Sequence, residues 1–154
     1  MGGDTPFEKV QQCLGIGLPL NPGWVAANGV TVVWQAFDEW LLLTADGGQN
    51  ALLERLRSAL DGRHAAITDV SDLRAGFEIR GPRSRDLLAK GCAIDLHPRV
   101  FTTGDCAQTA LARVRVTLRQ LDDTPAYQVL VERSYAQFLW DWLTDAALEF
   151  GSST

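Results

Sequence analysis

The chain has 154 residues, of which 46% are hydrophobic and 21% are charged. This composition is typical of a globular protein and excludes a disordered or collagen-like chain. Its formal net charge of −5 gives no net positive field for binding a polyanion. We therefore expect neither a nucleic acid nor an anionic membrane surface as a partner.

No segment has the pattern of a membrane span or a targeting signal. The longest apolar runs, such as residues 40–44, are far shorter than the roughly 20 residues that a span needs. The first ten residues, MGGDTPFEKV, lack a positive region followed by an apolar one, so we expect a cytoplasmic protein. The three cysteines, Cys13, Cys92 and Cys106, lack CxxC spacing, which argues against a disulfide framework.

Residues 1–29 are predicted to form an arm or loop that precedes a single domain. This segment includes GIGLPLNPGW (15–24), where glycines and prolines interrupt any regular pattern. The domain itself is expected over 30–150, with a short tail over 151–154. A chain of this length can bury a core of its own and fold without a partner.

The first regular elements are expected to be a β-hairpin and an amphipathic helix. Residues 30–46 are rich in β-branched and aromatic side chains and break at Asp38-Glu39, which predicts two strands joined by a tight turn. The helix is indicated by leucines at helical spacing, namely Leu52, Leu53, Leu56 and Leu60. We expect this helix to end at Gly62.

The segment EIRGPRSRDLLAKG (78–91) raises the question of whether its Gly-Pro turn binds phosphate. A phosphate-binding loop exposes the N–H groups of several glycines, whereas this turn has one glycine followed by Pro82, which has no N–H. Pro82 suits the first position of a helix, and Gly91 suits a left-handed cap at its end. We therefore interpret the turn as a corner between a strand through Phe77 and Ile79 and a short helix.

The second half is predicted to add two strands and a long helix. Residues 109–121 alternate between polar and apolar side chains, and residues 126–132 form another strand. The last helix is expected to begin after Ser134, which would be its N-cap. Its apolar face contains Tyr135, Phe138, Leu139, Trp142, Ala146 and Phe150. The predicted fold class is α+β, with helices packed on a mainly antiparallel sheet and ferredoxin-like halves.

No group of residues matches a known catalytic or metal-binding pattern. His97 lies between Cys92 and Cys106, but this spacing fits no structural zinc site. Asp69 and Ser71 could be drawn as a hydrolase triad with a remote histidine, yet Ser71 lacks the Gly-x-Ser-x-Gly sequence that exposes a nucleophile. We expect no catalytic, cofactor-binding or metal-binding residue in this chain.

Two tryptophans and two arginines are the candidates for a partner interface. At about 100° per residue, Trp140 lies about 140° from Tyr135, off the main apolar face of the last helix. Trp24 lies in the expected arm, and Arg113 and Arg115 share one face of a predicted strand. Large aromatic side chains displaced from the core are enriched at interfaces. The alternatives are that Trp140 belongs to a broad helix face under the arm and that the arginines face solvent.

A second group of arginines crowds the Gly-Pro corner. Arg80, Arg83 and Arg85 could hold a carboxylate or a phosphate bidentately. Because surface ion pairs are common and weak, we favour a solvated helix start in which they pair with Asp86 or other acidic neighbours.

Several segments resemble the gamma subunit family of heterotetrameric sarcosine oxidases. The matching pieces are, in chain order, LGIGLPLNPG, FDEWLLLT, AITDVSDLRAGFEIRGPRSRDLLAKGCAIDLHPRVF, TTGDCAQTALARV and AYQVLVERSYAQFLWDWLTDA. The most specific is the succession of a strand, RGP, a helix and CAIDLHPRVF, and the DEW turn adds support. Together they cover nearly the whole chain.

The resemblance implies a non-catalytic, assembly subunit of an oxidoreductase complex. Such a complex oxidises sarcosine to glycine, with hydrogen peroxide and either formaldehyde or 5,10-methylenetetrahydrofolate as the other products. The partners implied for this chain are the alpha, beta and delta subunits. The resemblance places FAD, FMN, NAD and tetrahydrofolate in the alpha and beta subunits and zinc in the delta subunit, with no cofactor on this chain.

The same family looks like a truncated relative of the folate-binding aminomethyltransferases, whose N-terminal part this fold is expected to resemble. That relation keeps open a standalone folate-binding or one-carbon-transfer protein. Those enzymes carry paired aspartates at the strand corresponding to ALARVRVTL, where this chain has residues 112–115 and no carboxylate. Arginine cannot replace an acid that steers a proton, because its side chain carries only donors. A third hypothesis is a homo-oligomeric scaffold that associates through the Trp140 helix.

Overall fold

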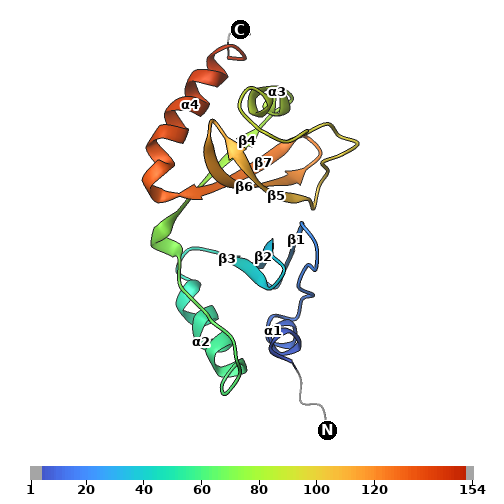
Figure 1. The fold of residues 1–154 in the computed structure, drawn as a ribbon, viewed down its shortest axis with the longest axis vertical. Coiled ribbons are helices and arrows are strands. Elements are labelled where there is room, and N and C mark those ends of the chain that lie inside the picture. The colour runs from blue at the N-terminus through green and yellow to red at the C-terminus, as the bar shows by residue number, and fades with distance from the viewer. Residues whose placement is uncertain (1–4, 152–154) are drawn as a thin grey trace. The chain divides into compact units, whose positions relative to one another are not determined.

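The contacts within the chain divide it into two compact units, Met1–Ser71 and Asp72–Thr154. A computed structural model describes residues 5–151 (Figure 1). The boundary at Ser71 lies inside the single domain expected over 30–150, and the expected arm over 1–29 contributes regular structure to the first unit. The domain division therefore differs from the one read from the sequence.

Helix α1 (Pro6–Leu14) occupies the N-terminal segment that was predicted to be irregular. The helix begins with a capping box, in which the Glu8 N–H donates to the Thr5 hydroxyl at 3.2 Å and the Thr5 N–H donates to the Glu8 carboxylate at 2.7 Å. These bonds satisfy two of the N–H groups that a helix start leaves unpaired. Gly15, at a φ of +66°, ends the helix in the left-handed region.

The first unit contains a three-stranded antiparallel sheet in the order β1-β2-β3. Its strands are β1 (Trp24–Ala27), β2 (Val30–Ala36) and β3 (Glu39–Thr44). The β2–β3 pair confirms the predicted hairpin, since Ala36 pairs with Glu39 across a turn at Phe37 and Asp38. Helix α2 (Gln49–Ala59) confirms the predicted amphipathic helix, although it ends before Gly62.

The core of the first unit is formed by one face of this sheet together with the two helices. Val30 and Val32 alternate toward this core, as expected for a strand with one buried face. The buried residues of the cluster are Leu14, Leu18, Val30, Val32, Leu52 and Leu56. The leucine spacing that predicted α2 therefore marks its buried side.

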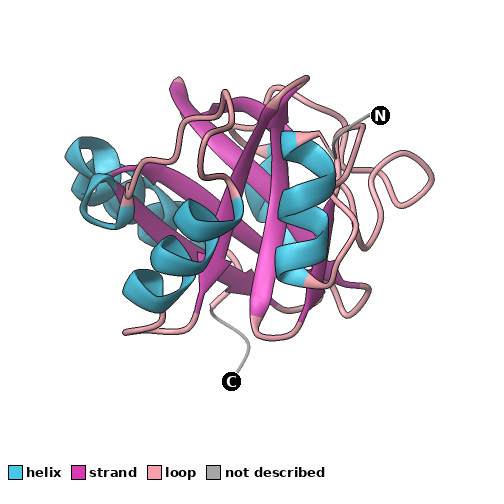
Figure 2. Ribbon diagram, turned by 90° about the horizontal axis from the view of Figure 1, so that it is seen from below, coloured by secondary structure: helices cyan, strands magenta, loops and turns pink. Residues whose placement is uncertain are grey.

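The second unit contains a four-stranded antiparallel sheet in the order β4-β7-β6-β5. Its elements are β4 (Arg74–Arg80), α3 (Ser84–Ala89), β5 (Cys106–Leu111), β6 (Val114–Asp122), β7 (Ala126–Glu132) and α4 (Ala136–Leu148). The order begins β-α-β-β, as in a ferredoxin-like unit, and then adds β7 before the last helix. The helices and antiparallel sheets of both units confirm the α+β class (Figure 2).

The alternating segment over 109–121 forms two strands rather than one. Ala112 and Arg113 have φ angles of +49° and +69°, and Leu111 pairs with Val114 across them. Positive φ at both central residues is the geometry of the two-residue hairpin turn that matches strand twist. The turn escaped prediction because it contains no Gly, Asn or Asp, the residues that usually mark it.

The Gly-Pro sequence forms a corner, as expected, but its details differ. Gly81 has a φ of +122°, and both its N–H and the Ser84 hydroxyl donate to the Pro125 carbonyl, at 3.2 Å and 3.1 Å. Helix α3 begins at Ser84, two residues after Pro82. Gly91 is not the left-handed cap, because α3 ends with Lys90 in the right-handed helical region and Gly91 has no positive φ.

Helix α4 also begins later than predicted. A 3₁₀ turn over Arg133–Tyr135 precedes it, so that Tyr135 and not Ser134 is the N-cap residue. Its buried residues are Leu139, Leu143 and Ala146. Tyr135 and Phe138, which were assigned to the apolar face, are about half exposed, at 48% and 52%.

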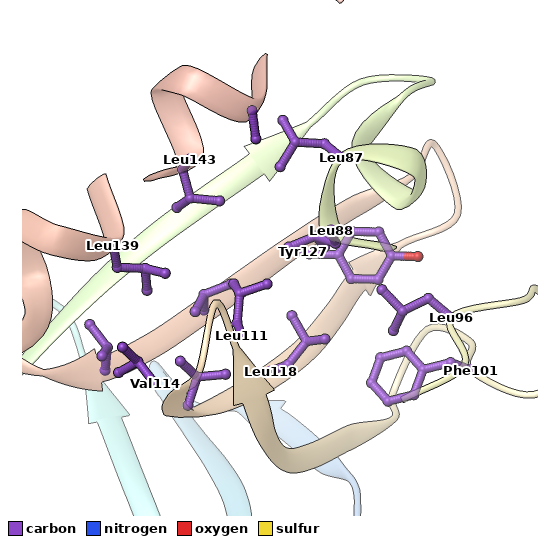
Figure 3. Close-up of a cluster of buried hydrophobic side chains, with 14 residues drawn as sticks. Leu87, Leu88, Leu96, Phe101, Leu111, Val114, Leu118, Tyr127, Leu139 and Leu143 are labelled. Atoms are coloured by element: carbon purple, nitrogen blue, oxygen red, sulfur yellow. The ribbon is translucent and has the colours of Figure 1, made fainter. Parts of the chain in front are cut away.

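The core of the second unit is one cluster between the sheet and the two helices (Figure 3). Tyr127, Val129 and Val131 of β7 are fully buried and alternate toward this cluster, as a central strand requires. The close-up shows Tyr127 in a cluster with Leu87 and Leu88 of α3, Leu139 and Leu143 of α4, and Leu96 and Phe101 of the connecting loop. Among residues 5–151, no helix is both long enough and apolar enough to cross a membrane.

Gly91 is constrained by a close approach to α4. A Cβ atom at this position would lie 2.5 Å from Cζ2 of Trp142 and 3.1 Å from the Ala112 nitrogen. We therefore expect Gly91→Ala to lower the free energy of unfolding of this unit by about 1–3 kcal/mol, as overpacking does. Chemical denaturation would measure this change, and Gly17→Ala is the control, since its nearest neighbour would be 3.8 Å away. Equal midpoints for the two variants would contradict the steric argument.

Lys90 connects the end of α3 to the end of α4. Its Nζ lies 2.5 Å from the Glu149 carboxylate and donates to the Ala146 carbonyl at 2.8 Å. The hydrogen bond and the charge of Lys90 lower the pKa of Glu149 below its ordinary value of 4.5. Because the folded pKa is the lower one, the stabilisation is present above the unfolded pKa and is lost as the pH falls through the folded pKa.

The pH dependence of stability should report this pair. We expect Glu149→Gln to lower the melting temperature slightly at neutral pH, and the gap to the unchanged protein to shrink as the pH falls below 4.5 and through the folded pKa of Glu149. Thermal unfolding followed by circular dichroism over a pH series would measure the difference. A gap between the two proteins that stays constant through the acid range would contradict the linkage.

Candidate partner interface

The four candidate interface residues are distributed over the two units. Trp24 lies in the first unit, while Arg113, Arg115 and Trp140 lie in the second. Arg113 occupies the β5–β6 turn, at one edge of the four-stranded sheet, whereas Trp140 packs beside β4, at the other edge. Within the second unit, the structure therefore does not gather the two arginines and Trp140 into one site.

Trp140 lies off the buried side of α4, as the helical spacing predicted. The side chain is 52% exposed and leans on Phe77 of β4, with ring centroids 5.8 Å apart and an interplanar angle of 33°. Phe77 belongs to the inward face of its strand and is partly buried against the core. The indole is thus held in place on one side and open to solvent on the other. Its role at an interface remains a prediction.

Trp24 is the first residue of the edge strand β1 rather than part of a loop. It pairs with Val33 of β2, and its side chain is half-buried. An edge strand has one side without a strand partner in its sheet, which suits contact with another chain. Its assignment to an interface likewise stays a prediction.

Arg113 and Arg115 do not share a strand face, contrary to the prediction. Arg113 is in the hairpin turn, because the strand breaks at Ala112 and resumes at Val114. Arg115 lies in β6 and donates from Nη2 to the Gln108 side-chain oxygen at 2.8 Å. Both side chains are exposed.

Two arginines at the Gly-Pro corner are paired with carboxylates. Arg80 lies 2.9 Å from Glu78 and 3.3 Å from Asp122, and Arg83 lies 2.6 Å from Asp86. These pairs are exposed, so they contribute little to stability. Arg80 and Arg83 therefore form exposed ion pairs with acidic neighbours, which is the arrangement favoured from the sequence.

The residues considered for catalysis have structural contacts in their own loops. The Ser71 hydroxyl donates to the Asp69 carboxylate at 2.6 Å, and its N–H donates to the same oxygen at 2.9 Å. These two bonds lower the pKa of Asp69, since they favour its ionised form. The Asp69 carboxylate thus accepts from the backbone two residues on, as in an Asx-turn, and the Ser71 hydroxyl supports this turn.

His97 also serves its loop. Its ring Nδ1 accepts from the backbone N–H of Arg99 at 3.2 Å. The backbone N–H of His97 donates to the Asp95 carboxylate at 2.8 Å. Within residues 5–151, no three His, Cys, Asp or Glu side chains are placed so that they could hold a metal ion.

An open hollow of about 250 Å³ lies in the first unit, between the end of α2 and the segment that follows it. It is lined by Arg57, Leu60, Asp61, Gly62, Ala65 and Ile67. This lining contains one guanidinium and one carboxylate but neither a thiol, a hydroxyl nor an imidazole. The side chains that line the hollow therefore supply no serine, cysteine or histidine nucleophile, and Asp61 is the one acid among them.

Sequence reasoning missed the most exposed of the large apolar side chains in residues 5–151. Phe37 is 90% exposed, and Leu20 is 69% exposed, both in the first unit. Phe37 stood inside the predicted hairpin, where it was counted with the strand residues. The predicted break at Asp38-Glu39 lies one residue after the turn at Phe37 and Asp38, so Phe37 was read as the end of a strand.

The family model for the sarcosine oxidase gamma subunit matches residues 3–149. The chain belongs to this family. It is 36% identical over 154 residues to the sarcosine oxidase subunit gamma of Arthrobacter sp., covering 99% of this chain and 74% of the relative. It is 32% identical over 153 residues to the subunit gamma of Corynebacterium sp. (strain U-96), covering 98% and 73%.

A solved structure supports the same relationship. The fold matches a chain in the heterotetrameric sarcosine oxidase from Corynebacterium sp. U-96 in complex with pyrrole 2-carboxylate, with a TM-score of 0.89 and 31% identity. The match covers 100% of this chain and 78% of that one. The resemblance found in the sequence is thereby confirmed.

Removal of the exposed indole should cost little stability. We expect Trp140→Ala to lower the free energy of unfolding by about 1 kcal/mol, the size of an aromatic pair, and to leave the fold intact. Phe138→Ala is the matched control, because its ring is also 52% exposed on α4. Chemical denaturation of both variants measures the difference. A loss of several kcal/mol for Trp140→Ala would show that the indole is a core residue.

Proposed function

We propose that this chain is the non-catalytic gamma subunit of a heterotetrameric sarcosine oxidase. The observation that carries the proposal is the match over the whole chain to a chain of such a heterotetramer, at a TM-score of 0.89. The two chains are also 31% identical, so they are similar in sequence as well as in fold. The role of the chain in this proposal is assembly.

The contacts of the chain fit an assembly role better than a catalytic one. Ser71 and Asp69 are bonded to each other in a capping turn, and His97 accepts from its own loop. Catalysis requires a nucleophile or base with an orienting partner, facing a place where substrate can bind. The described residues instead present large exposed apolar side chains, which are characteristic of interfaces.

The proposed partners are the alpha, beta and delta subunits of the oxidase. In this proposal the complex converts sarcosine, oxygen and water into glycine, hydrogen peroxide and formaldehyde, or transfers the one-carbon unit to tetrahydrofolate. FAD, FMN, NAD and tetrahydrofolate are assigned to the alpha and beta subunits, and zinc is assigned to the delta subunit. We place the complex in the cytoplasm.

Co-expression with the other subunits of the same host tests the proposal. We expect the tagged chain to purify in a yellow complex much heavier than its own 16.9 kDa, active in sarcosine-dependent peroxide formation. Omission of this chain should reduce the yield of the assembled complex. Mass measurement, a visible spectrum and a peroxide assay provide the readouts.

Two controls separate assembly from catalysis. Ser71→Ala should leave peroxide formation per bound flavin unchanged in the assembled complex, because the Ser71 hydroxyl donates only to Asp69 in its own turn. A chain that purifies alone and colourless would contradict the proposal. Tetrahydrofolate binding by that isolated chain, measured by calorimetry, would support a standalone folate protein instead.

A further inference from the structure

The turn between β2 and β3 presents an aromatic side chain to solvent. Phe37 is 90% exposed, the highest value among the large apolar side chains of residues 5–151. Neither Phe37 nor Asp38 has a positive φ, so the backbone of this turn needs no particular residue, and turns at the surface usually carry polar side chains. Phe37 therefore meets no requirement of the turn or of the core.

The hairpin that carries Phe37 is firmly supported. Trp34 and Trp40 pair across the two strands next to the turn. The Trp40 indole N–H donates to the Pro19 carbonyl at 2.7 Å, and its ring lies 5.6 Å from that of Phe7 in α1. These contacts fix the base of the turn against the core of the first unit. An exposed anchor on a fixed base loses little conformational entropy when it binds.

A second exposed apolar side chain lies on the segment that Trp40 holds. Leu20 follows Pro19 directly and is 69% exposed. Because Trp40 is the second residue of β3, its bond to Pro19 keeps this segment beside the turn end of the strand. We define the hairpin-tip surface as Leu20, Phe37, Asp38 and Glu39.

The charge on the hairpin-tip surface is negative. Asp38 and Glu39 are both exposed, and neither carboxylate has an ion-pair partner among residues 5–151. Charges at the rim of an interface face opposite charges on the partner and steer the encounter. A complementary surface therefore has an apolar pocket with Lys or Arg side chains at its edge.

We propose that the hairpin-tip surface docks this chain onto a larger subunit of the oxidase, with Phe37 inserted into an apolar pocket that has a basic rim. This inference rests on the proposed function, since it names the surface used for assembly. A second copy of this chain fits less well, because two copies would bring the same carboxylates together. Aromatic anchors in desolvated pockets carry much of the binding energy of an interface.

Competition during assembly tests the docking surface. Unchanged and Phe37→Ala copies of the full chain, with different tags, are co-expressed with the other subunits, and mass spectrometry gives their ratio in the purified complex. We expect Phe37→Ala to be depleted at least about tenfold. The matched control, Phe138→Ala, removes a half-exposed ring from α4 and should be incorporated as well as the unchanged chain.

The salt dependence of association tests the role of the two carboxylates, Asp38 and Glu39. Asp38→Asn combined with Glu39→Gln should weaken the salt dependence of association, because screening then has fewer ion pairs to act on. The melting temperatures of the isolated variants should match that of the unchanged chain, since these side chains are exposed.

The outcomes distinguish this inference from the proposed function. If the unchanged chain enters the complex and Phe37→Ala enters equally, the docking surface is wrong while the subunit assignment stands. If the unchanged chain does not enter any complex, the proposed function fails first, and the docking surface fails with it. A dimer of the isolated chain that Phe37→Ala dissociates would identify a second copy as the occupant and overturn the proposal.

Discussion

The burial of one face of each antiparallel sheet under helices is the constraint on which both units depend. In the second unit, Tyr127, Val129 and Val131 place every second side chain of β7 in a fully buried position. Each of the two valines contributes about 1.5–3 kcal/mol through the hydrophobic effect. Because side chains alternate along a strand, a register slip of one residue would move all three from this core to the opposite face of the sheet. The core therefore fixes the register of β7 against β4 and β6.

The close approach of α4 to the Gly91 segment follows from the same burial. Leu139, Leu143 and Ala146 face the sheet, which brings Trp142 beside Gly91. Lys90 then lies near the last carbonyl groups of α4, where a positive charge is favourable. Lys90 and Gly91 are thus favoured for different reasons. The charge of Lys90 stabilises the end of α4, and the missing side chain of Gly91 leaves room for Trp142.

Regular periodicity made part of this fold predictable. The hairpin at residues 30–46, helix α2 and strand β7 follow from alternation and from helical spacing. Helix α1 was missed although its capping box, Thr5 to Glu8 with Pro6 between, is visible in the sequence. The β5–β6 turn could not be found in this way, since Ala112 and Arg113 give no turn signal and alternation continues on both sides.

The candidate site was less predictable for a different physical reason. Catalytic and metal sites need particular residues at particular spacings, whereas an interface needs only a complementary surface on another chain. Trp140 could be placed off the core by helical geometry alone. Phe37 could not be distinguished from a strand residue until the turn had been located, because an exposed and a buried phenylalanine look the same in a sequence. The surface that would complement an exposed phenylalanine lies in another chain, so this sequence contains no signal for it.

The position of Phe37 separates the requirements of folding from those of assembly. A residue in the β2–β3 turn has no contact to make with the core, so folding alone would be served as well by Asn or Gly. Full exposure of a phenylalanine forgoes about 1.5–3 kcal/mol of the stabilisation that its burial provides. A subunit that functions within a complex can recover this free energy at its interface. The isolated chain therefore keeps an apolar side chain in water at the place where, in the complex, a partner can remove it from water.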